Sequence, residues 1–205
     1  MSDNVNMYEA EALDFAKEYA ERLRELYLTE ATYLDDTIHL NLVELCYMLG
    51  GDIETVGGTS YQEYAMLEAR EDGRFLVRLR IADHPDVKYE SSLRLATIIG
   101  DWILNFQDAE PGTTCRTDAD YRNNNSLEYR CAVRFGWNLL LPDGLFESTW
   151  WMYGCNEDAV GDVLNVYFIH VLYRARQLGL PERTPYLLGG RNDEGEYVPS
   201  ALRTE

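Results

Sequence analysis

Histidine and positive charge are scarce in this chain. Its 205 residues contain three histidines and 18 Lys and Arg against 36 Asp and Glu, which gives a formal net charge of −18. His39, His84 and His170 lie far apart, and no H-E-x-x-H string is present, so the helix-borne zinc site of a typical metallopeptidase is missing. So large an acidic excess repels nucleic-acid backbones and anionic membranes. We therefore expect no direct binding to nucleic acid or to a membrane.

Long apolar runs and paired cysteines are missing too. No run reaches the roughly 18 apolar residues of a membrane helix, and the N-terminal segment has no basic stretch followed by an apolar core. We therefore expect a cytoplasmic protein without a signal peptide. The four cysteines form no C-x-x-C pair, which favours reduced core thiols, with two disulfides as the alternative. No G-x-S-x-G string or phosphate-binding glycine loop points to another class of enzyme.

The acidic excess is concentrated toward the N-terminus. Residues 1–75 hold 17 of the 36 acidic residues but 5 of the 18 basic ones. An acidic surface can serve solubility alone. The alternative is that it engages a basic partner, such as the DNA site of a DNA-binding protein.

Residues 8–29 predict a long amphipathic helix. Its apolar positions recur at spacings of three and four, which is the period of one helix face, and they are Leu13, Ala16, Ala20, Leu23 and Tyr27. This stripe can pack on the domain, on a partner helix or on a second copy in a homodimer. The other faces are acidic and hold Glu9, Glu11, Asp14, Glu18, Glu21 and Glu25.

The remaining pattern predicts an α+β fold, mostly helical with a small antiparallel or mixed sheet. Strands are expected at 52–56, 61–69 and 75–82, with a hairpin at the Asp-Gly pair that separates the last two. Further helices are expected at 38–49, 90–106, 126–140, 143–153, 157–164 and 168–178. Residues 107–125 are predicted as a surface loop and 180–205 as an extended or partly disordered tail. Strands grouped between helices favour an α+β domain over an alternating sheet.

Two groups of side chains are candidate binding residues besides the acidic helix. Arg78 and Arg80 share one face of the strand at 75–82, where they pair with nearby carboxylates or line a binding surface. Trp150 and Trp151 are adjacent in a short helix, so at most one of them can point into the core. The complete candidate set is Arg78, Arg80, Glu128, Trp150, Trp151, Glu18, Glu21 and Glu25.

The apolar helix at 93–106 contains Gly100 and Asp101 near its middle. A glycine there costs roughly 1 kcal/mol of helix stability, and an unpaired buried aspartate costs more. The segment resembles a degenerate zinc helix of the ImmA/IrrE family of metallopeptidase-like proteins, which reads A-H-E-L-G-H before an apolar run. Thr97 and Asp101 stand where that family has its two histidines, and Ile98 stands at its glutamate. Ala96 and Gly100 keep the small positions.

A second match to this family lies downstream. Its members continue with a helix of the form E-A-x-x-F-A-x-x-L-L-M-P and close with L-G-L, and this chain reads C-A-V-R-F-G-W-N-L-L-L-P at 131–142 and Q-L-G-L at 177–180. The resemblance therefore implies an ImmA/IrrE-like domain with a zincin-like core at 38–180. Outside it we expect an acidic N-terminal helix at 1–37 and a C-terminal tail at 181–205.

The resemblance also implies that the metal site has been lost. Cys131 would replace the third ligand, but threonine is a poor zinc ligand, so Asp101 and Cys131 supply two good ligands where three are normal. Glu128, one turn before Cys131, could add another. Ile98 cannot act as the base. We expect no metal and no other cofactor, with a retained peptidase or a structural zinc as the alternative. Asp101 then points into the former cleft, or it is a buried aspartate bonded to a neighbour.

Three functions remain open from the sequence. The resemblance implies a pseudoenzyme of a phage or mobile element that binds a protein with a basic surface, such as a helix-turn-helix regulator, through the former cleft and the arginine face. The acidic surface instead favours an inhibitor that imitates DNA phosphates toward a DNA-binding or host defence protein, acting in the host cytoplasm if the source is viral. An enzyme of unrecognised type is the third.

Overall fold

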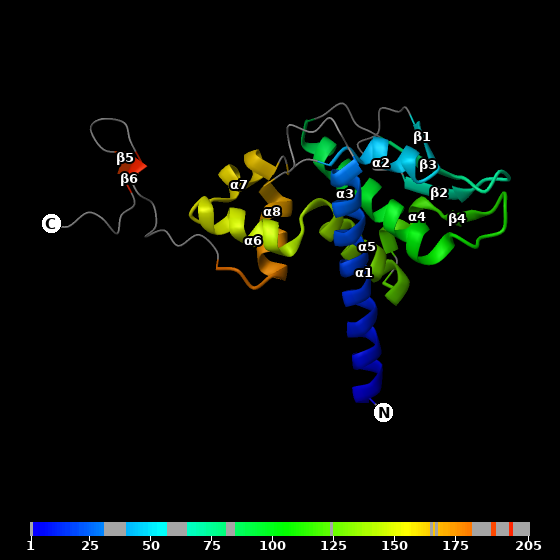
Figure 1. Cartoon of the computed structure of the whole chain (residues 1–205), viewed down its shortest axis with the longest axis horizontal. Helices are drawn as coiled ribbons and strands as arrows, with labels where there is room; N and C mark the ends of the chain where they lie inside the picture. Colours follow the sequence, from blue (N-terminus) through cyan, green and yellow to red (C-terminus); the bar gives the residue numbers. More distant parts are fainter. Residues whose placement is uncertain are drawn as a thin grey trace. The chain divides into compact units, whose positions relative to one another are not determined.

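The computed structural model describes residues 2–30, 40–56, 65–80, 85–123, 125–164, 166, 168–181, 190–191 and 197–198. The chain divides into two compact units, Met1–Pro142 and Asp143–Glu205 (Figure 1). The boundary follows the Leu-Pro pair that ends a helix. The division predicted after residues 37 and 180 stays a prediction.

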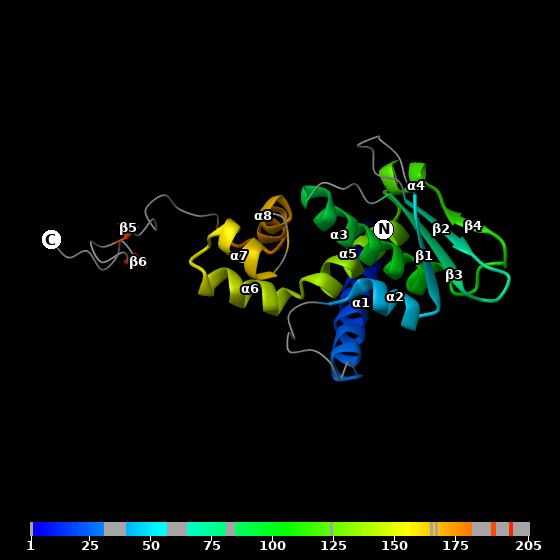
Figure 2. The same cartoon turned by 90° about the horizontal axis from the view of Figure 1, so that it is seen from above.

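Unit 1 combines a four-stranded mixed sheet with helices and confirms the predicted α+β class. Its helices are α1 (Ser2–Glu30), α2 (Leu42–Met48), α3 (Pro85–Asp101), the π-helix η1 (Trp102–Phe106), α4 (Asp118–Asn123) and α5 (Leu127–Leu140). Its strands are β1 (Gly51–Thr55), β2 (Ala65–Ala69), β3 (Phe75–Leu79) and β4 (Thr114–Arg116). Helix α3 lies against the sheet, α5 packs on α3, and α1 packs on α5 (Figure 2).

The sheet has the order β1-β3-β2-β4, in which β1 is parallel to β3 and the other neighbours are antiparallel. Phe75, Val77 and Leu79 are buried, as the alternation of β3 predicts. Gly73, at the tip of the β2–β3 hairpin, has a φ of 78°, which glycine adopts without strain. The three predicted strands are confirmed at their centres, whereas residues 61–64 and 81–82 lie outside the described residues.

The predicted loop at 107–125 is wrong in part, because it contains β4 and α4. Strand β4 is three residues long and exists through its pairing with β2, which no local periodicity reveals. Helix α4 follows a Thr117 turn, where the backbone N and the hydroxyl of Thr117 donate to Asp120 at 2.8 and 2.7 Å. These bonds lower the pKa of Asp120.

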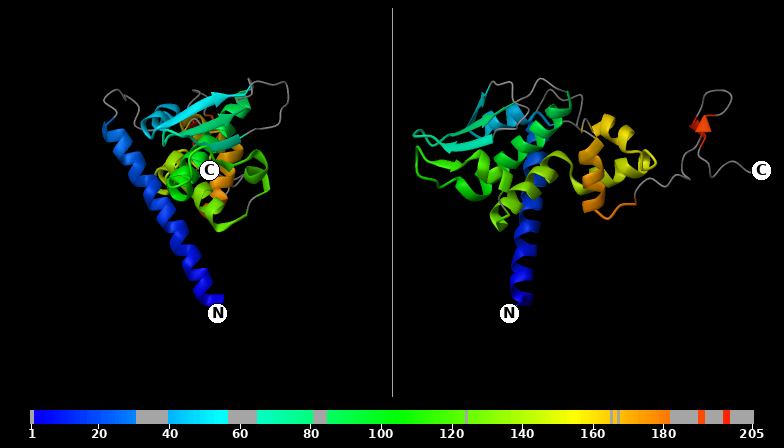
Figure 3. Two further views of the ribbon diagram at one scale, coloured as in Figure 1. Left: turned by 90° about the vertical axis from the view of Figure 1, so that its right-hand side faces the viewer. Right: turned by 180° about the vertical axis from the view of Figure 1, so that it is seen from behind.

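Helix α1 confirms the predicted helix and packs its predicted stripe on α5. Ala16, Ala20 and Tyr27 are buried, and Arg24 donates from Nη1 to the Leu139 carbonyl at 2.9 Å. That bond satisfies one of the carbonyls that a helix C-terminus leaves unpaired. The first turns of α1 extend past the rest of unit 1 (Figures 1 and 3).

Helices α3 and α5 cross at two glycines. A Cβ at Gly100 would lie 2.5 Å from the Phe135 ring, and one at Gly136 would lie 2.8 Å from the backbone N and the hydroxyl of Thr97. Each helix therefore supplies a gap into which the other packs, since real Cβ atoms do not approach so closely. Gly100 thus permits the close packing of α3 and α5.

Unit 2 is helical at its start. Its elements are α6 (Asp143–Met152), α7 (Glu157–Leu164), α8 (Phe168–Gln177) and the paired strands β5 (Gly190–Arg191) and β6 (Tyr197–Val198). Trp150 is buried, stacks on Phe146 at 6.0 Å and donates to the Pro181 carbonyl. Buried Arg174 pairs with Asp143. The last two helices are confirmed, and most of the predicted tail lies outside the described residues.

Two negative findings apply to the described part of the chain. None of the four cysteines, all of which are described, forms a disulfide, so the alternative of two disulfides is wrong. Within the same ranges, no helix combines the length and the hydropathy needed to cross a bilayer.

Candidate functional site

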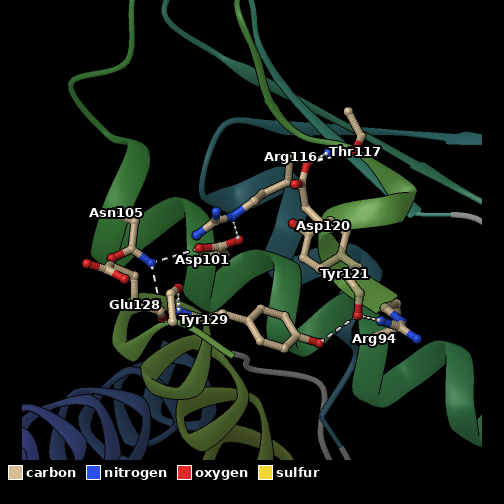
Figure 4. A network of polar contacts seen from close by, with 10 residues as sticks. Arg94, Asp101, Asn105, Arg116, Thr117, Asp120, Tyr121, Glu128 and Tyr129 are labelled. Atoms are coloured by element: carbon tan, nitrogen blue, oxygen red, sulfur yellow. Dashed lines mark hydrogen bonds and ion pairs between the residues drawn. The ribbon is translucent and has the colours of Figure 1, made fainter. Parts of the chain in front are cut away.

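The centre of the candidate site is Asp101, the last residue of α3. Its side chain has no exposed surface, and both carboxylate oxygens are occupied. Asn105 donates from Nδ2 to Oδ1 at 2.7 Å, and Arg116 donates from Nε to Oδ2 at 3.0 Å (Figure 4). Of the two environments that the sequence left open for Asp101, the structure shows the buried aspartate bonded to its neighbours.

Arg116 brings a positive charge to this carboxylate from the edge strand β4. Its side chain is 17% exposed, and its guanidinium lies 5.0 Å from the centre of the Phe106 ring, which is a cation–π distance. Burial by itself lowers the pKa of Arg116, but the hydrogen bond and the charge of Asp101 outweigh it, so the net shift is upward. Arg116 therefore carries its positive charge at neutral pH.

The π-helix places Asn105 over Asp101. In η1 the helix widens directly after Asp101, a local change that is frequent at functional sites. Asn105 also donates to the Glu128 carbonyl at 3.4 Å, which joins the end of α3 to the start of α5. Trp102 stacks on Phe75 at 4.8 Å and so anchors the same segment to the sheet. The π-helix thus links three elements around one carboxylate.

Tyr121 of α4 closes the other side of the network. It is 3% exposed, and its carbonyl accepts hydrogen bonds from Tyr129 Oη at 3.0 Å and from Arg94 Nη1 at 3.2 Å (Figure 4). Burial, and then the charge of Asp101, raise the pKa of Tyr121 well above its usual value. The phenol therefore stays protonated and cannot serve as a base near neutral pH.

The other positions that the resemblance assigns to a lost metal site do not bring ligands to Asp101. The Thr97 hydroxyl donates to the Leu93 carbonyl of its own helix at 2.9 Å, and Ile98 is fully buried in the core. Cys131 is 8% exposed, and burial raises the pKa of its thiol, which disfavours the thiolate that a metal needs. Among the residues that the structure describes, no group of three or more His, Cys, Asp and Glu could hold a metal ion. The donor set therefore does not fit zinc.

Glu128 is exposed at the start of α5. Hydrogen bonds from its own backbone N–H and from the Ser126 hydroxyl lower the pKa of its carboxyl group, as suits an acid in the first turn of a helix. Its side chain serves the helix terminus, and a role in binding stays a prediction.

Arg78 makes ion pairs across the sheet. It bonds Glu54 on β1 and Glu68 on β2, both at 2.7 Å, and these bonds raise its pKa despite the opposing effect of burial. The pairing alternative is therefore confirmed for Arg78. Arg80, directly after β3, is partly buried, and a binding role for either arginine stays a prediction.

The remaining candidates differ in exposure. Trp151 is 57% exposed while its neighbour Trp150 is buried, so the expected split between the two holds. Glu18 and Glu25 are exposed on α1, and Glu21 is partly buried. The acidic helix face is thus exposed, whereas Thr97 and Asp101 are buried.

Sequence reasoning missed Arg116, Asn105 and Tyr121. Asn105 lies four residues after Asp101, so their contact across one helical turn could have been found from spacing. Arg116 and Tyr121 fall in the segment predicted as a loop. Only the Thr-x-x-Asp pattern that begins at Thr117, a helix-start signal, could have indicated order there.

At the centre of the network, Asp101 is buried and both of its oxygens accept hydrogen bonds, whereas the buried hydroxyl of Tyr121 has no hydrogen-bond partner in the part of the chain that the structure describes. The network contains no activated nucleophile, no free base and no ligand set for a metal within the described residues. Comparison with known proteins gives no assignment, since no family model, no curated protein and no solved structure matches the chain. At its centre the network contains one ion pair, between Arg116 and Asp101.

Proposed function

We propose that the chain is a non-catalytic, ImmA/IrrE-like pseudo-metallopeptidase with a zincin-like core, which acts by binding another protein. One observation supports this above all. Asp101 stands where the family has its second zinc histidine, and its oxygens are taken by Arg116 and Asn105. A guanidinium thus supplies the positive charge that a metal would supply in an active relative, and it leaves no open position for water or substrate.

The proposed partner is a protein with a basic surface, such as a DNA-binding regulator or a host defence factor. In this proposal the chain is encoded by a phage or mobile element and binds its partner in the cytoplasm. The charge of −18 favours fast encounter with such a surface and disfavours nucleic acid itself. The exposed acids of α1 keep a second candidate open, in which the surface imitates DNA and needs no cleft. An active metallopeptidase is disfavoured by the ligand set.

Metal analysis tests the proposal. The full chain, purified without a histidine tag or added chelator, is measured by plasma mass spectrometry and assayed for peptide hydrolysis with and without added zinc. We expect well under one equivalent of zinc and no hydrolysis that added zinc stimulates. The matched variants are Asp101→Ala and Cys131→Ala, with Cys155→Ala in unit 2 as the control. Zinc near one equivalent, lost in the first two variants and kept in the control, would refute the proposal.

A further inference from the structure

Helix α1 has a second apolar stripe that unit 1 covers only in part, since the Tyr19 ring lies 6.2 Å from the Phe135 ring of α5. Tyr8, Phe15, Tyr19 and Leu26 are 67, 59, 39 and 62% exposed, although α1 already buries Ala16, Ala20 and Tyr27 on another face. The four side chains are spaced by seven, four and seven residues. On a helix this spacing forms one line, which is roughly 27 Å long from first to last at 1.5 Å per residue.

The spacing is that of a coiled-coil seam. With Tyr19 and Leu26 at a positions, Tyr8 and Phe15 occupy d positions, Ala12 is a further a position, and Arg22 takes the remaining d position. Within the stripe, the Phe15 and Tyr19 rings lie 6.0 Å apart. An exposed line of apolar side chains with this period, interrupted by Arg22, marks a surface for another helix.

Acidic residues border the seam on its open side. Glu11 and Glu18 occupy the g positions of successive heptads and are exposed, and Asp14 lies beyond them. Residues at e and g set the partner and the orientation of paired helices by charge. On the other border the e positions are used within unit 1, because Glu9 pairs with Arg130 and Ala16 is buried.

A second copy of the chain fits this seam poorly. An antiparallel copy would set Glu11 and Glu18 against the same glutamates, and a parallel copy would set them against e positions that hold Glu9, Ala16 and Leu23, none of them a cation. Like charges placed opposite one another are destabilising, and two chains of charge −18 repel at long range as well.

We propose that the seam of α1, defined by Tyr8, Phe15, Tyr19 and Leu26 with Glu11 and Glu18 at its border, docks an amphipathic helix of another protein that has Lys or Arg beside its apolar face. The inference rests on the proposed binding function and names the chemistry of the partner. Apolar side chains of the partner would fill the a and d layers, and its cations would meet the g glutamates.

A designed peptide tests the seam in the full-length chain. The probe is a fluorescein-labelled helix of about three heptads with Leu at a and d and Lys at e and g, and the matched probe has Glu in place of Lys. We expect the fluorescence anisotropy of the Lys peptide to rise to a plateau as the chain is added. The Glu peptide should bind at least about tenfold more weakly. Failure of the Lys peptide to bind would overturn the inference.

Charge reversal separates the seam from bulk acidity. The variant Glu11→Lys/Glu18→Lys should lower the affinity for the Lys peptide by about tenfold or more and raise the affinity for the Glu peptide. The control Glu71→Lys/Glu110→Lys changes the net charge equally at two exposed loop positions away from α1 and should leave both affinities within about twofold. Equal weakening by the two double variants would show that net charge alone attracts the peptide, which refutes the inference.

The apolar line is tested separately from the charges. Phe15→Ser removes an exposed ring, so the far-ultraviolet circular dichroism of the chain should not change, while affinity for the Lys peptide should fall by about tenfold or more. Sedimentation that shows a dimer of the wild-type chain, dissociated by Phe15→Ser, would assign the seam to a second copy and overturn the proposal. A zinc-loaded, hydrolysing chain would refute the proposed function without altering the peptide result, so the two failures are distinguishable.

Discussion

The buried carboxylate of Asp101 depends on Arg116 as its counter-ion. Arg116 Nε lies 3.0 Å from the carboxylate, in a place from which water is largely removed. Burying such a pair is expensive, so the pair adds little net stability, but removing one partner leaves an uncompensated charge. Asn105 cannot replace the arginine, because it is neutral and already donates to the other oxygen.

Arg116→Met should therefore destabilise the chain strongly. We expect a loss of about 3 kcal/mol in the free energy of unfolding, measured by urea denaturation. The double variant Asp101→Leu/Arg116→Met removes both charges and should be more stable than Arg116→Met alone. Arg70→Ala is the control, since Arg70 is 44% exposed in its pair with Asp52 and should cost no more than about 1 kcal/mol. A double variant less stable than the single one would contradict the account.

At the scale of elements, the crossing of α3 and α5 depends on two glycines that a helix would otherwise avoid. Gly100 lies under the Phe135 ring, and Gly136 lies against Thr97. The close approach brings the end of α3 to the start of α5, where Asn105 reaches the Glu128 carbonyl. The geometry of the polar network thus depends on how tightly the two helices pack.

Gly100→Ala should lower stability even though alanine favours the helix. Alanine gains up to about 1 kcal/mol of helix propensity, but its Cβ would meet the Phe135 ring at 2.5 Å, and overpacking of this kind costs typically about 1–3 kcal/mol. We expect a net loss in thermal and urea denaturation. Adding Phe135→Leu should recover part of it.

The matched control lies in another helix. Gly144 of α6 has open space where a Cβ would stand, so Gly144→Ala should be neutral or stabilising by a few tenths of a kcal/mol. Equal effects at both positions would show that backbone propensity, and not packing against Phe135, decides the outcome.

The sequence predicts those elements whose own residues define them. Helix α1 and strand β3 bury periodic stripes, and their periods are visible without tertiary information. Strand β4 and helix α4 are defined by partners, namely β2 for the strand and the Thr117 turn for the helix. The site divides in the same way, because Asp101 stands out in an apolar run, whereas its counter-ion comes from the short strand that local pattern cannot detect.

At the scale of the whole molecule, the net charge of −18 dominates the behaviour of the chain in solution. Several carboxylates are paired, as Glu54 and Glu68 are with Arg78, but acids outnumber bases by two to one. Self-repulsion of the excess charge opposes the compact state. Salt screens such repulsion with a Debye length of about 10 Å at 0.1 M.

The melting temperature should therefore rise as sodium chloride is increased from about 0.02 to about 0.5 M, as measured by differential scanning calorimetry at neutral pH. A parallel series in potassium chloride separates screening from a specific cation effect, because screening depends only on ionic strength. A melting temperature that falls with salt would mean that attractive ion pairs outweigh the repulsion.

The hydrogen bond from Arg24 to the Leu139 carbonyl joins residues 115 positions apart, and this separation matters during synthesis. At translation rates of about 5–20 residues per second, α1 is made roughly 6–23 s before the helix that will cover its inner face. Throughout that interval both apolar faces of α1 are uncovered on the nascent chain. Helix α1 thus waits for α5 while the residues between them are made, and its inner apolar face is open to a chaperone during that time.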